Sequence, residues 1–177
     1  MSVDFSNNHF ELFDLPITFE LNEAKLVSRF QSLQRELHPD RFASATAAEK
    51  RWSMQAASLV NEAYQKLTSP LTRATYLLEL NNISIDEETD TQMDPMFLMQ
   101  QMELREAIGD APDASDPFDA LDKVRKTLNE GIQDSSNKFA QAAASNDWDA
   151  ARTVVREWQF FDKLKRETKA LEARLDD

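Results

Sequence analysis

The sequence predicts an all-α fold made of two helical modules. Only 2 of the 177 residues are glycine and 41% are hydrophobic, which is typical of helices joined by short polar connections. Apolar residues recur at steps of three and four in long segments, the period of a helix that buries one face. A polar, acidic stretch over residues 82–93 separates the two groups of predicted helices.

The first module begins with a short helical turn over residues 8–14 and continues with a long helix. Asn22 can cap a helix over residues 23–37, because its side-chain oxygen accepts a free backbone N–H. Pro39 disfavours helical geometry in the residue before it, so this helix must end near His38. Its apolar stripe consists of Leu26, Phe30, Leu33 and Leu37.

A return helix completes the predicted hairpin. After a polar loop over residues 39–45, Thr46 and Glu49 form a capping box that starts a helix over residues 47–68. Two long helices joined by a short loop pack antiparallel in the simplest arrangement, with the loop at the tip. A further helix is expected over residues 70–81. The stripe of the return helix consists of Trp52, Ala56, Leu59, Ala63 and Leu67, with Val60 and Tyr64 beside it.

The second module is predicted to be an antiparallel three-helix bundle. Asp94-Pro95 and Asp116-Pro117 each place an acid at the N-cap and a proline in the first helical position, where its missing N–H costs nothing. The expected helices cover residues 95–109, residues 117–144 and a last segment to about residue 175. Their apolar stripes are Phe118, Leu121, Val124, Leu128, Ile132 and Phe139 in the second helix, and Val154, Trp158, Phe161, Leu164, Leu171 and Leu175 in the last.

Composition excludes several classes of function. The net charge of −12, from 20 Lys+Arg and 32 Asp+Glu, argues against a nucleic acid or an anionic membrane as partner. The chain has no cysteine and two histidines, so we expect neither a metal site nor a cofactor. It also shows no basic-then-apolar signal segment and no apolar run of about 20 residues. We therefore expect a cytoplasmic protein.

Charge is unevenly distributed between the two modules. Residues 1–80 hold eight basic and ten acidic side chains, whereas residues 81–177 hold twelve basic and twenty-two acidic ones. A difference of this size indicates that the two modules have different partners.

The most specific local motif is His38-Pro39-Asp40, between the two long helices. Proline fixes its own φ and stiffens the turn, so the imidazole and the carboxylate are displayed at a helix-hairpin end. From these three residues alone, an ordinary interhelical turn is the simpler interpretation. A catalytic His–Asp pair would need a nucleophile and an oxyanion site, which the surrounding sequence does not supply. The nearby cations, which suit an acidic protein partner, are Lys25, Arg29, Arg35 and Arg41.

The wider context resembles a J-domain, and in particular the HscB-type J-domain co-chaperones of iron–sulfur cluster assembly. Four segments carry the resemblance in chain order: LQRELHPDRFA (33–43), VNEAYQKLTSPLTRATYLLEL (60–80), FLMQQMELREAI (97–108) and FFDKL (160–164). The resemblance implies a J-domain with a connecting helix over residues 1–81. An acidic linker would follow over residues 82–93, and a three-helix bundle that binds a scaffold protein over residues 94–177.

The resemblance also implies roles for the motif. His38, Pro39 and Asp40 would engage a specialised DnaK-type chaperone, HscA, and stimulate its ATPase. Lys25, Arg29 and Arg35 would supply the electrostatic part of the contact. A protein of this kind is not an enzyme and has no catalytic residue of its own. Eukaryotic members often carry an N-terminal extension with cysteines, so this chain resembles the bacterial form.

The helix predicted over residues 95–109 has two apolar faces. A helical wheel places Phe97, Leu104 and Ile108 on one narrow stripe that suits a core. A Met or Leu stripe usually reflects core packing, but the second face is edged by carboxylates, and burying unpaired carboxylates is expensive. Methionine is also common at recognition surfaces. A partner-binding face is therefore favoured, consisting of Leu98, Met99, Met102, Glu103 and Glu106.

In the HscB family the positions that match Leu98, Met99, Met102, Glu103, Glu106 and Phe160 capture an IscU-type iron–sulfur scaffold. The leading hypothesis is therefore an adaptor that brings this scaffold to the chaperone. A general J-domain co-chaperone that delivers other or unfolded clients is the alternative. An enzyme that uses His38 and Asp40 in a cleft is a third, weaker hypothesis.

Overall fold

The protein is helical throughout the part described by its computed structural model, residues 3–85 and 94–176. These ranges contain seven α-helices, two short 3₁₀ helices and no strand, which confirms the predicted all-α class. The chain divides into two compact units, Met1–Leu80 and Asn81–Asp177, here called the N-terminal unit and the C-terminal unit. None of the described helices combines the length and the apolar character needed to cross a membrane.

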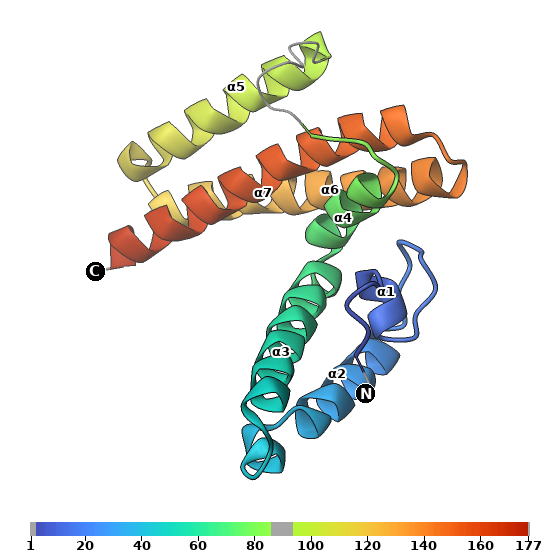
Figure 1. The fold of residues 1–177 in the computed structure, drawn as a ribbon. Coiled ribbons are helices and arrows are strands. Elements are labelled where there is room, and N and C mark those ends of the chain that lie inside the picture. Colours follow the sequence, from blue (N-terminus) through green and yellow to red (C-terminus); the bar gives the residue numbers. More distant parts are fainter. Residues whose placement is uncertain (1–2, 86–93, 177) are drawn as a thin grey trace. The chain divides into compact units, whose positions relative to one another are not determined.

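The N-terminal unit is a helical hairpin with a short helix at each end of the chain segment (Figure 1). Its α-helices are α1 (His9–Leu12), α2 (Glu23–Glu36), α3 (Ala47–Thr68) and α4 (Pro70–Leu80). The predicted caps are confirmed: the Asn22 side chain accepts the N–H of Lys25, and Thr46 and Glu49 cap reciprocally. The polar loop predicted over residues 39–45 contains a short 3₁₀ helix, η1 (Pro39–Phe42).

The core of the N-terminal unit lies between α1, α2, α3 and α4. The predicted stripe of α3 is rotated by one residue at its start, because Ser53 and Val60 are buried while Trp52 and Leu59 are only partly buried. The large side chains of this core that are fully buried are Phe10, Phe13, Leu33, Val60, Leu67 and Leu78.

The C-terminal unit is a three-helix bundle of α5 (Pro95–Asp110), α6 (Pro117–Ala144) and α7 (Trp148–Asp176). Helices α6 and α7 run side by side along most of their length, and α5 packs against both (Figure 1). The two predicted N-caps are confirmed, since Asp94 accepts the N–H of Met96 and Asp116 accepts that of Asp119. The core cluster contains Phe97, Leu104, Val124, Leu128, Phe161 and Leu164.

The predicted bundle core is confirmed in part. Ile132, Leu171 and Leu175 are partly buried, and Phe118 and Val154 also differ from the prediction. Phe118 is 47% exposed, because it lies in the first turn of α6. Val155, rather than Val154, is the buried valine of α7. Of the acidic linker predicted over residues 82–93, residues 86–93 lie outside the described part of the chain.

Candidate functional site

The tip of the α2–α3 hairpin consists of His38, Pro39 and Asp40, and it is exposed to solvent. The side chains of His38 and Asp40 are 59% and 92% exposed. The Nδ1 atom of His38 accepts the backbone N–H of Asp40 at 3.3 Å and lies 3.6 Å from the Asp40 carboxylate. Pro39 occupies the first position of η1, where its fixed φ suits the turn. The two polar side chains are thus presented from a short, internally bonded turn.

The residues beside the tip explain why it projects outward. Leu37 is the C-cap of α2 and is buried, with its N–H bonded to the carbonyl of Leu33. The chain therefore leaves the core immediately before His38. The helix ends at Glu36, two residues earlier than His38, as expected from the constraint that Pro39 places on the residue before it.

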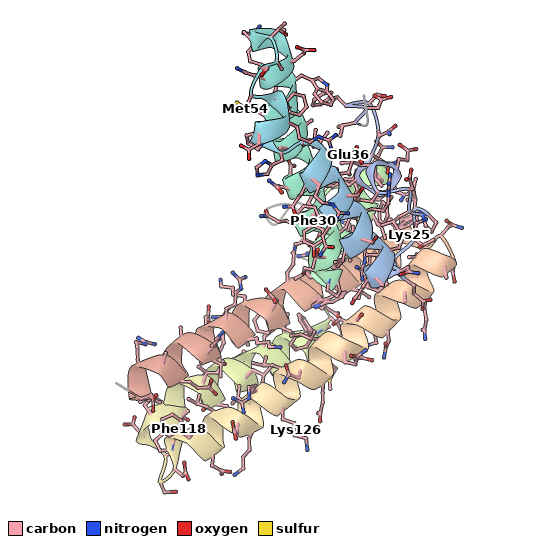
Figure 2. The ribbon with its side chains drawn as sticks, turned by 90° about the horizontal axis from the view of Figure 1, so that it is seen from below. Lys25, Phe30, Glu36, Met54, Phe118 and Lys126 are labelled. Atoms are coloured by element: carbon pink, nitrogen blue, oxygen red, sulfur yellow. The ribbon has the colours of Figure 1, made fainter. Side chains whose placement is uncertain are left out.

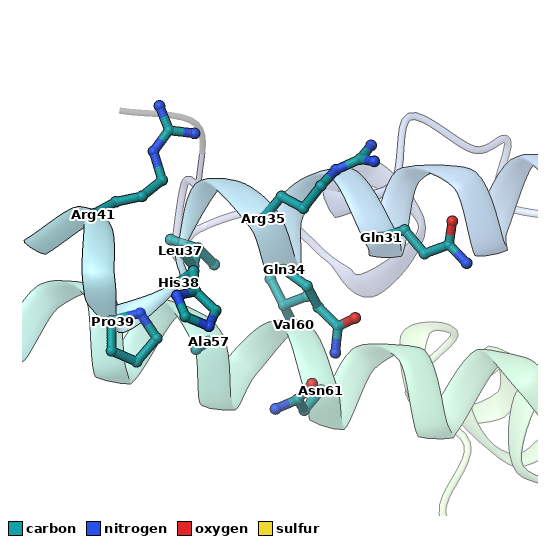
Figure 3. Close-up of a pocket in the computed structure, with 10 residues that line it drawn as sticks. All are labelled: Gln31, Gln34, Arg35, Leu37, His38, Pro39, Arg41, Ala57, Val60 and Asn61. Atoms are coloured by element: carbon teal, nitrogen blue, oxygen red, sulfur yellow. The ribbon is translucent and has the colours of Figure 1, made fainter.

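The predicted cations of α2 fall into two groups. Lys25 donates from Nζ to the backbone carbonyl of Asp14 at 2.5 Å, and Arg29 forms an ion pair with the Asp14 carboxylate at 2.5 Å. Asp14 has a φ of 53° and lies in the loop that precedes α2. Arg35 and Arg41 are exposed and extend away from α3 beside the tip (Figure 3). Sequence reasoning missed Asp14, because nothing local marks it as the partner of two later side chains.

A surface pocket of about 830 Å³ lies next to the tip. Its walls come from both α2 and α3, with Gln34 and Asn61 drawn on opposite sides in Figure 3. Val60, which is buried, and Ala57 supply apolar surface from α3. The sequence predicted a contact surface on α2 and the tip only, and the structure adds a pocket wall from α3 next to it. The lining residues are Gln31, Gln34, Arg35, Leu37, His38, Pro39, Arg41, Ala57, Val60 and Asn61.

The arrangement at the tip suits recognition of another protein. It offers an imidazole, a carboxylate and two guanidinium groups to solvent beside a pocket with an apolar wall. Charged groups of this kind steer and orient a partner of opposite charge. Within residues 3–85 and 94–176, no group of three or more His, Asp or Glu side chains is arranged to hold a metal ion.

Helix α5 has a buried stripe and an exposed apolar face, which confirms the two-faced helix predicted by the wheel. Phe97 and Leu104 are buried in the bundle core. The exposed face, called the docking face below, has Leu98 at 43%, Met99 at 56% and Met102 at 72% exposure. Its remaining members, Glu103 and Glu106, are also exposed. Exposed apolar side chains edged by carboxylates are typical of a protein-binding surface.

Phe160 lies beside the core of the bundle and is partly buried. Its ring makes edge contacts with Phe97 and Phe161, at centroid distances of 5.6 and 5.9 Å. The guanidinium carbon of Arg105 lies 5.5 Å from the ring centroid, over the ring. Phe160 therefore packs as part of the bundle and also contacts the polar side of α5 through Arg105.

A second pocket, of about 460 Å³, borders the docking face. Met99 and Glu103 line it from α5, and Glu157 lines it from α7. Burial raises the pKa of Glu157, and the carboxylates of Asp94 and Asp134 raise it further, while Lys138 lowers it. Lys138 is itself bound to Asp134 at 2.7 Å. Carboxylates are thus the most frequent charged groups around this pocket. The sequence predicted the negative charge of this unit but not that these side chains lie together.

Comparison with known proteins gives consistent matches over both units. A family model described as "HSCB C-terminal oligomerisation domain" matches residues 93–169. The "Co-chaperone protein HscB homolog" of Photobacterium profundum is 42% identical over 165 residues, which cover 93% of this chain and 96% of that protein. The structure of HscB from Vibrio cholerae matches with a TM-score of 0.85 at 39% identity, covering 96% of this chain and 99% of the other. Human HscB matches with a TM-score of 0.89 at 30% identity, covering 96% and 84%.

Proposed function

Because this chain belongs to the HscB family of co-chaperones, we propose that it binds an IscU-type iron–sulfur scaffold and stimulates the ATPase of an HscA-type chaperone. The observation that carries the proposal is the presence of two exposed surfaces on separate compact units. The tip lies on the N-terminal unit and the docking face on the C-terminal unit. In this role the chain promotes cluster assembly or transfer in the bacterial cytoplasm.

The tip, in this proposal, acts on the chaperone without performing chemistry. A ligand shifts a conformational equilibrium by binding one state more tightly than the other. His38, Pro39 and Asp40 would bind the state of the chaperone that hydrolyses ATP, and Arg35 beside them would add charge complementarity. The chain is then an activator of a partner's ATPase and not itself an enzyme.

The docking face would hold the scaffold through apolar contact at its centre and through charge at its edge. Leu98, Met99 and Met102 supply the apolar contact, and Glu103 and Glu106 favour a partner with basic residues around an apolar patch. Binding chaperone and scaffold on one chain raises the effective concentration of each at the other.

The substitution Asp40→Asn tests the role of the tip. We expect ATPase stimulation of the cognate chaperone to fall by about tenfold or more, because a charge-assisted contact is lost while the shape is kept. Affinity for the scaffold, measured by calorimetry, should not change. The Asp40 side chain is almost fully exposed, and its carboxylate lies 3.6 Å from Nδ1 of His38. The hydrogen bond from Asp40 to His38 is donated by the backbone N–H, so the substitution keeps it and the fold should persist. Stimulation at the wild-type level would contradict the proposal for the tip.

Binding of the scaffold is tested separately from the role of the tip, with the wild-type chain. If the purified scaffold fails to bind the wild-type chain, the specialist function is wrong. The chain would then be a general J-domain co-chaperone that delivers other clients.

A further inference from the structure

Every methionine in the described ranges is more than half exposed. Met54 of α3, which is labelled in Figure 2, is 72% exposed, and Met96 of α5 is 70% exposed. Met99 and Met102 belong to the docking face. Methionine commonly fills irregular gaps in protein cores, but no described methionine is used in that way here. Their thioethers are open to reagents in solution.

Three of these side chains form one continuous row on α5. Met96, Met99 and Met102 follow one another at intervals of three residues, and side chains at that interval are neighbours on a helix surface. We call Met96, Met99 and Met102 the methionine row. Met99 and Met102 also belong to the docking face, so a chemical change along the row changes the surface proposed to bind the scaffold.

We propose that the methionine row is a site of reversible oxidation to methionine sulfoxide, and that this modification weakens binding of the scaffold. The inference rests on the proposed function for its effect on binding, but the modification site itself does not. The chain contains no cysteine, so methionine thioethers are its sulfur groups for reaction with a peroxide.

The chemistry balances with one peroxide for each methionine. The thioether sulfur attacks hydrogen peroxide, the O–O bond breaks, an S–O bond forms and water leaves. Sulfur loses two electrons and the peroxide gains them. Methionine sulfoxide reductases reverse the step with electrons from a dithiol, which becomes a disulfide, and the oxygen leaves as water.

The effect on binding follows from the polarity of the product. Sulfoxide formation converts a flexible apolar side chain into a polar one. An apolar contact between Met99 or Met102 and a partner would then require a strong dipole to lose its water, which disfavours burial. With two such side chains in the docking face, affinity for the scaffold should fall by about tenfold or more.

The test compares three proteins: the wild type, M96L/M99L/M102L and M54L. Leucine keeps the apolar character and the helix propensity of methionine but cannot be oxidised in this way. Each full-length protein is treated with hydrogen peroxide, which is then removed with catalase before a purified IscU-type scaffold is added. Peptide mass spectrometry locates each added oxygen, and calorimetry measures affinity before and after treatment. A portion of each oxidised sample is then incubated with both stereospecific reductases.

We expect oxygen at all three positions of the methionine row in the wild type, an affinity reduced about tenfold, and recovery after reductase treatment. M54L should behave as the wild type does. Whatever the affinity of untreated M96L/M99L/M102L, it should be the same before and after peroxide treatment. Equal loss in M96L/M99L/M102L, or unchanged affinity in fully oxidised wild type, would overturn the proposal.

A separate measurement distinguishes failure of this inference from failure of the proposed function. If the untreated wild type does not bind the scaffold, the proposed function is contradicted. Peptide mapping and retention on a hydrophobic-interaction column then test whether the methionine row is oxidised, independently of scaffold binding. A clearly larger shift to earlier elution in the oxidised wild type than in oxidised M96L/M99L/M102L, which keeps Met54, would support it. No oxygen on the row, or the same shift in both proteins, would overturn it.

Discussion

The two glycines of the chain occupy opposite environments, although both lie in helices. A Cβ built on Gly131 of α6 would lie 2.9 Å from the ring of Phe161, whereas a Cβ on Gly109 of α5 would meet nothing within 4 Å. Glycine is unfavourable in a helix by about 1 kcal/mol relative to alanine. At position 131 the lower helix propensity of glycine is offset because the missing side chain lets Phe161 of α7 pack closely. At position 109 no neighbouring group lies close enough to give such a benefit.

Replacing the two glycines with alanine should therefore change the free energy of unfolding in opposite directions. Gly131→Ala should destabilise the protein by about 1–2 kcal/mol, because the overlap with Phe161 outweighs the better helix propensity. Gly109→Ala should stabilise it by about 0.5 kcal/mol. Urea unfolding followed by circular dichroism measures both. Destabilisation of similar size in the two variants would contradict this account of Gly131.

His9 gives the N-terminal unit a predictable response to pH. Its ring stacks on Tyr76 with centroids 4.3 Å apart, and burial, followed by the charge of Lys66, lowers its pKa below the ordinary value of 6.5. As the pH falls, His9 is therefore protonated at a higher pH in the unfolded chain than in the folded one. The free energy of unfolding decreases as the pH falls below about 6.5.

The substitution His9→Phe tests this response, because it keeps an aromatic ring at the position and removes the titration. The wild type should lose more stability than the variant between about pH 7 and about pH 5. The excess loss should not exceed about 1 kcal/mol, since solvent reaches the ring. Thermal unfolding at several pH values provides the comparison. Parallel profiles for the two proteins would show that His9 does not cause the effect.

At the residue scale, contacts that are local in sequence could be predicted and distant ones could not. The caps at Asn22, Thr46 and Asp94 depend on side chains that reach two or three residues ahead, so the sequence alone predicts them. The contact of Asp14 with Arg29 spans a loop, and the sequence pattern contains no signal for such a pairing.

At the scale of single elements, α5 shows how far periodicity can be used. A wheel separates Phe97 and Leu104 from Leu98 and Met102, and the structure has the first pair buried and the second pair exposed. Periodicity was less reliable at a helix end, since Phe118 in the first turn of α6 is exposed although it lies on the apolar stripe. It also failed by one position in α7, where the wheel placed Val154 on the buried stripe but Val155 is the fully buried residue and Val154 is only partly buried.

The docking face can be tested without disturbing the core. Leu98→Ala combined with Met99→Ala removes exposed apolar groups, so the fold should persist while affinity for the scaffold falls by about tenfold or more. Calorimetry measures the affinity, and circular dichroism measures the fold.

Phe118→Ala is the matched control for the docking face. Phe118 is a similarly exposed apolar residue of the same unit that lies outside the docking face, so binding should not change. Unchanged affinity in the double variant, or equal loss in Phe118→Ala, would contradict the role given to the docking face. Phe160 is less suitable for this test, because its ring contacts Phe97 and Phe161 of the core.

At the scale of the whole molecule, the uneven charge follows the division into units. The N-terminal unit is close to neutral, and the exposed Arg35 and Arg41 lie beside its tip. The C-terminal unit holds most of the net charge of −12. The sequence therefore indicated two modules of different charge. It could not give the surface pocket beside the tip, which requires α2 and α3 to be packed together.

The proposed function requires both surfaces on one chain, and a mixing experiment tests that requirement. A mixture of the Asp40→Asn variant and the Leu98→Ala/Met99→Ala variant contains one intact copy of each surface, but on different molecules. Scaffold-dependent enhancement of the chaperone ATPase should stay lost, because covalent linkage is worth a factor of about a hundred or more in effective concentration. A steady-state ATPase assay gives the answer. Full recovery in the mixture would show that the two surfaces act independently.

The contact between Asp14 and Arg29 has a consequence for how a partner would meet α2. A Lys or Arg side chain that is flexible in the unbound protein loses rotamer entropy when a partner immobilises it, at a cost of about 0.5–1.5 kcal/mol. Lys25 and Arg29 contact Asp14 in the folded protein, so much of this entropy is already lost when the protein folds and not when a partner binds. A guanidinium has five N–H donors, and Arg29 therefore keeps donors for a second acceptor. The α2 surface would in this sense be ordered before a partner protein binds to it.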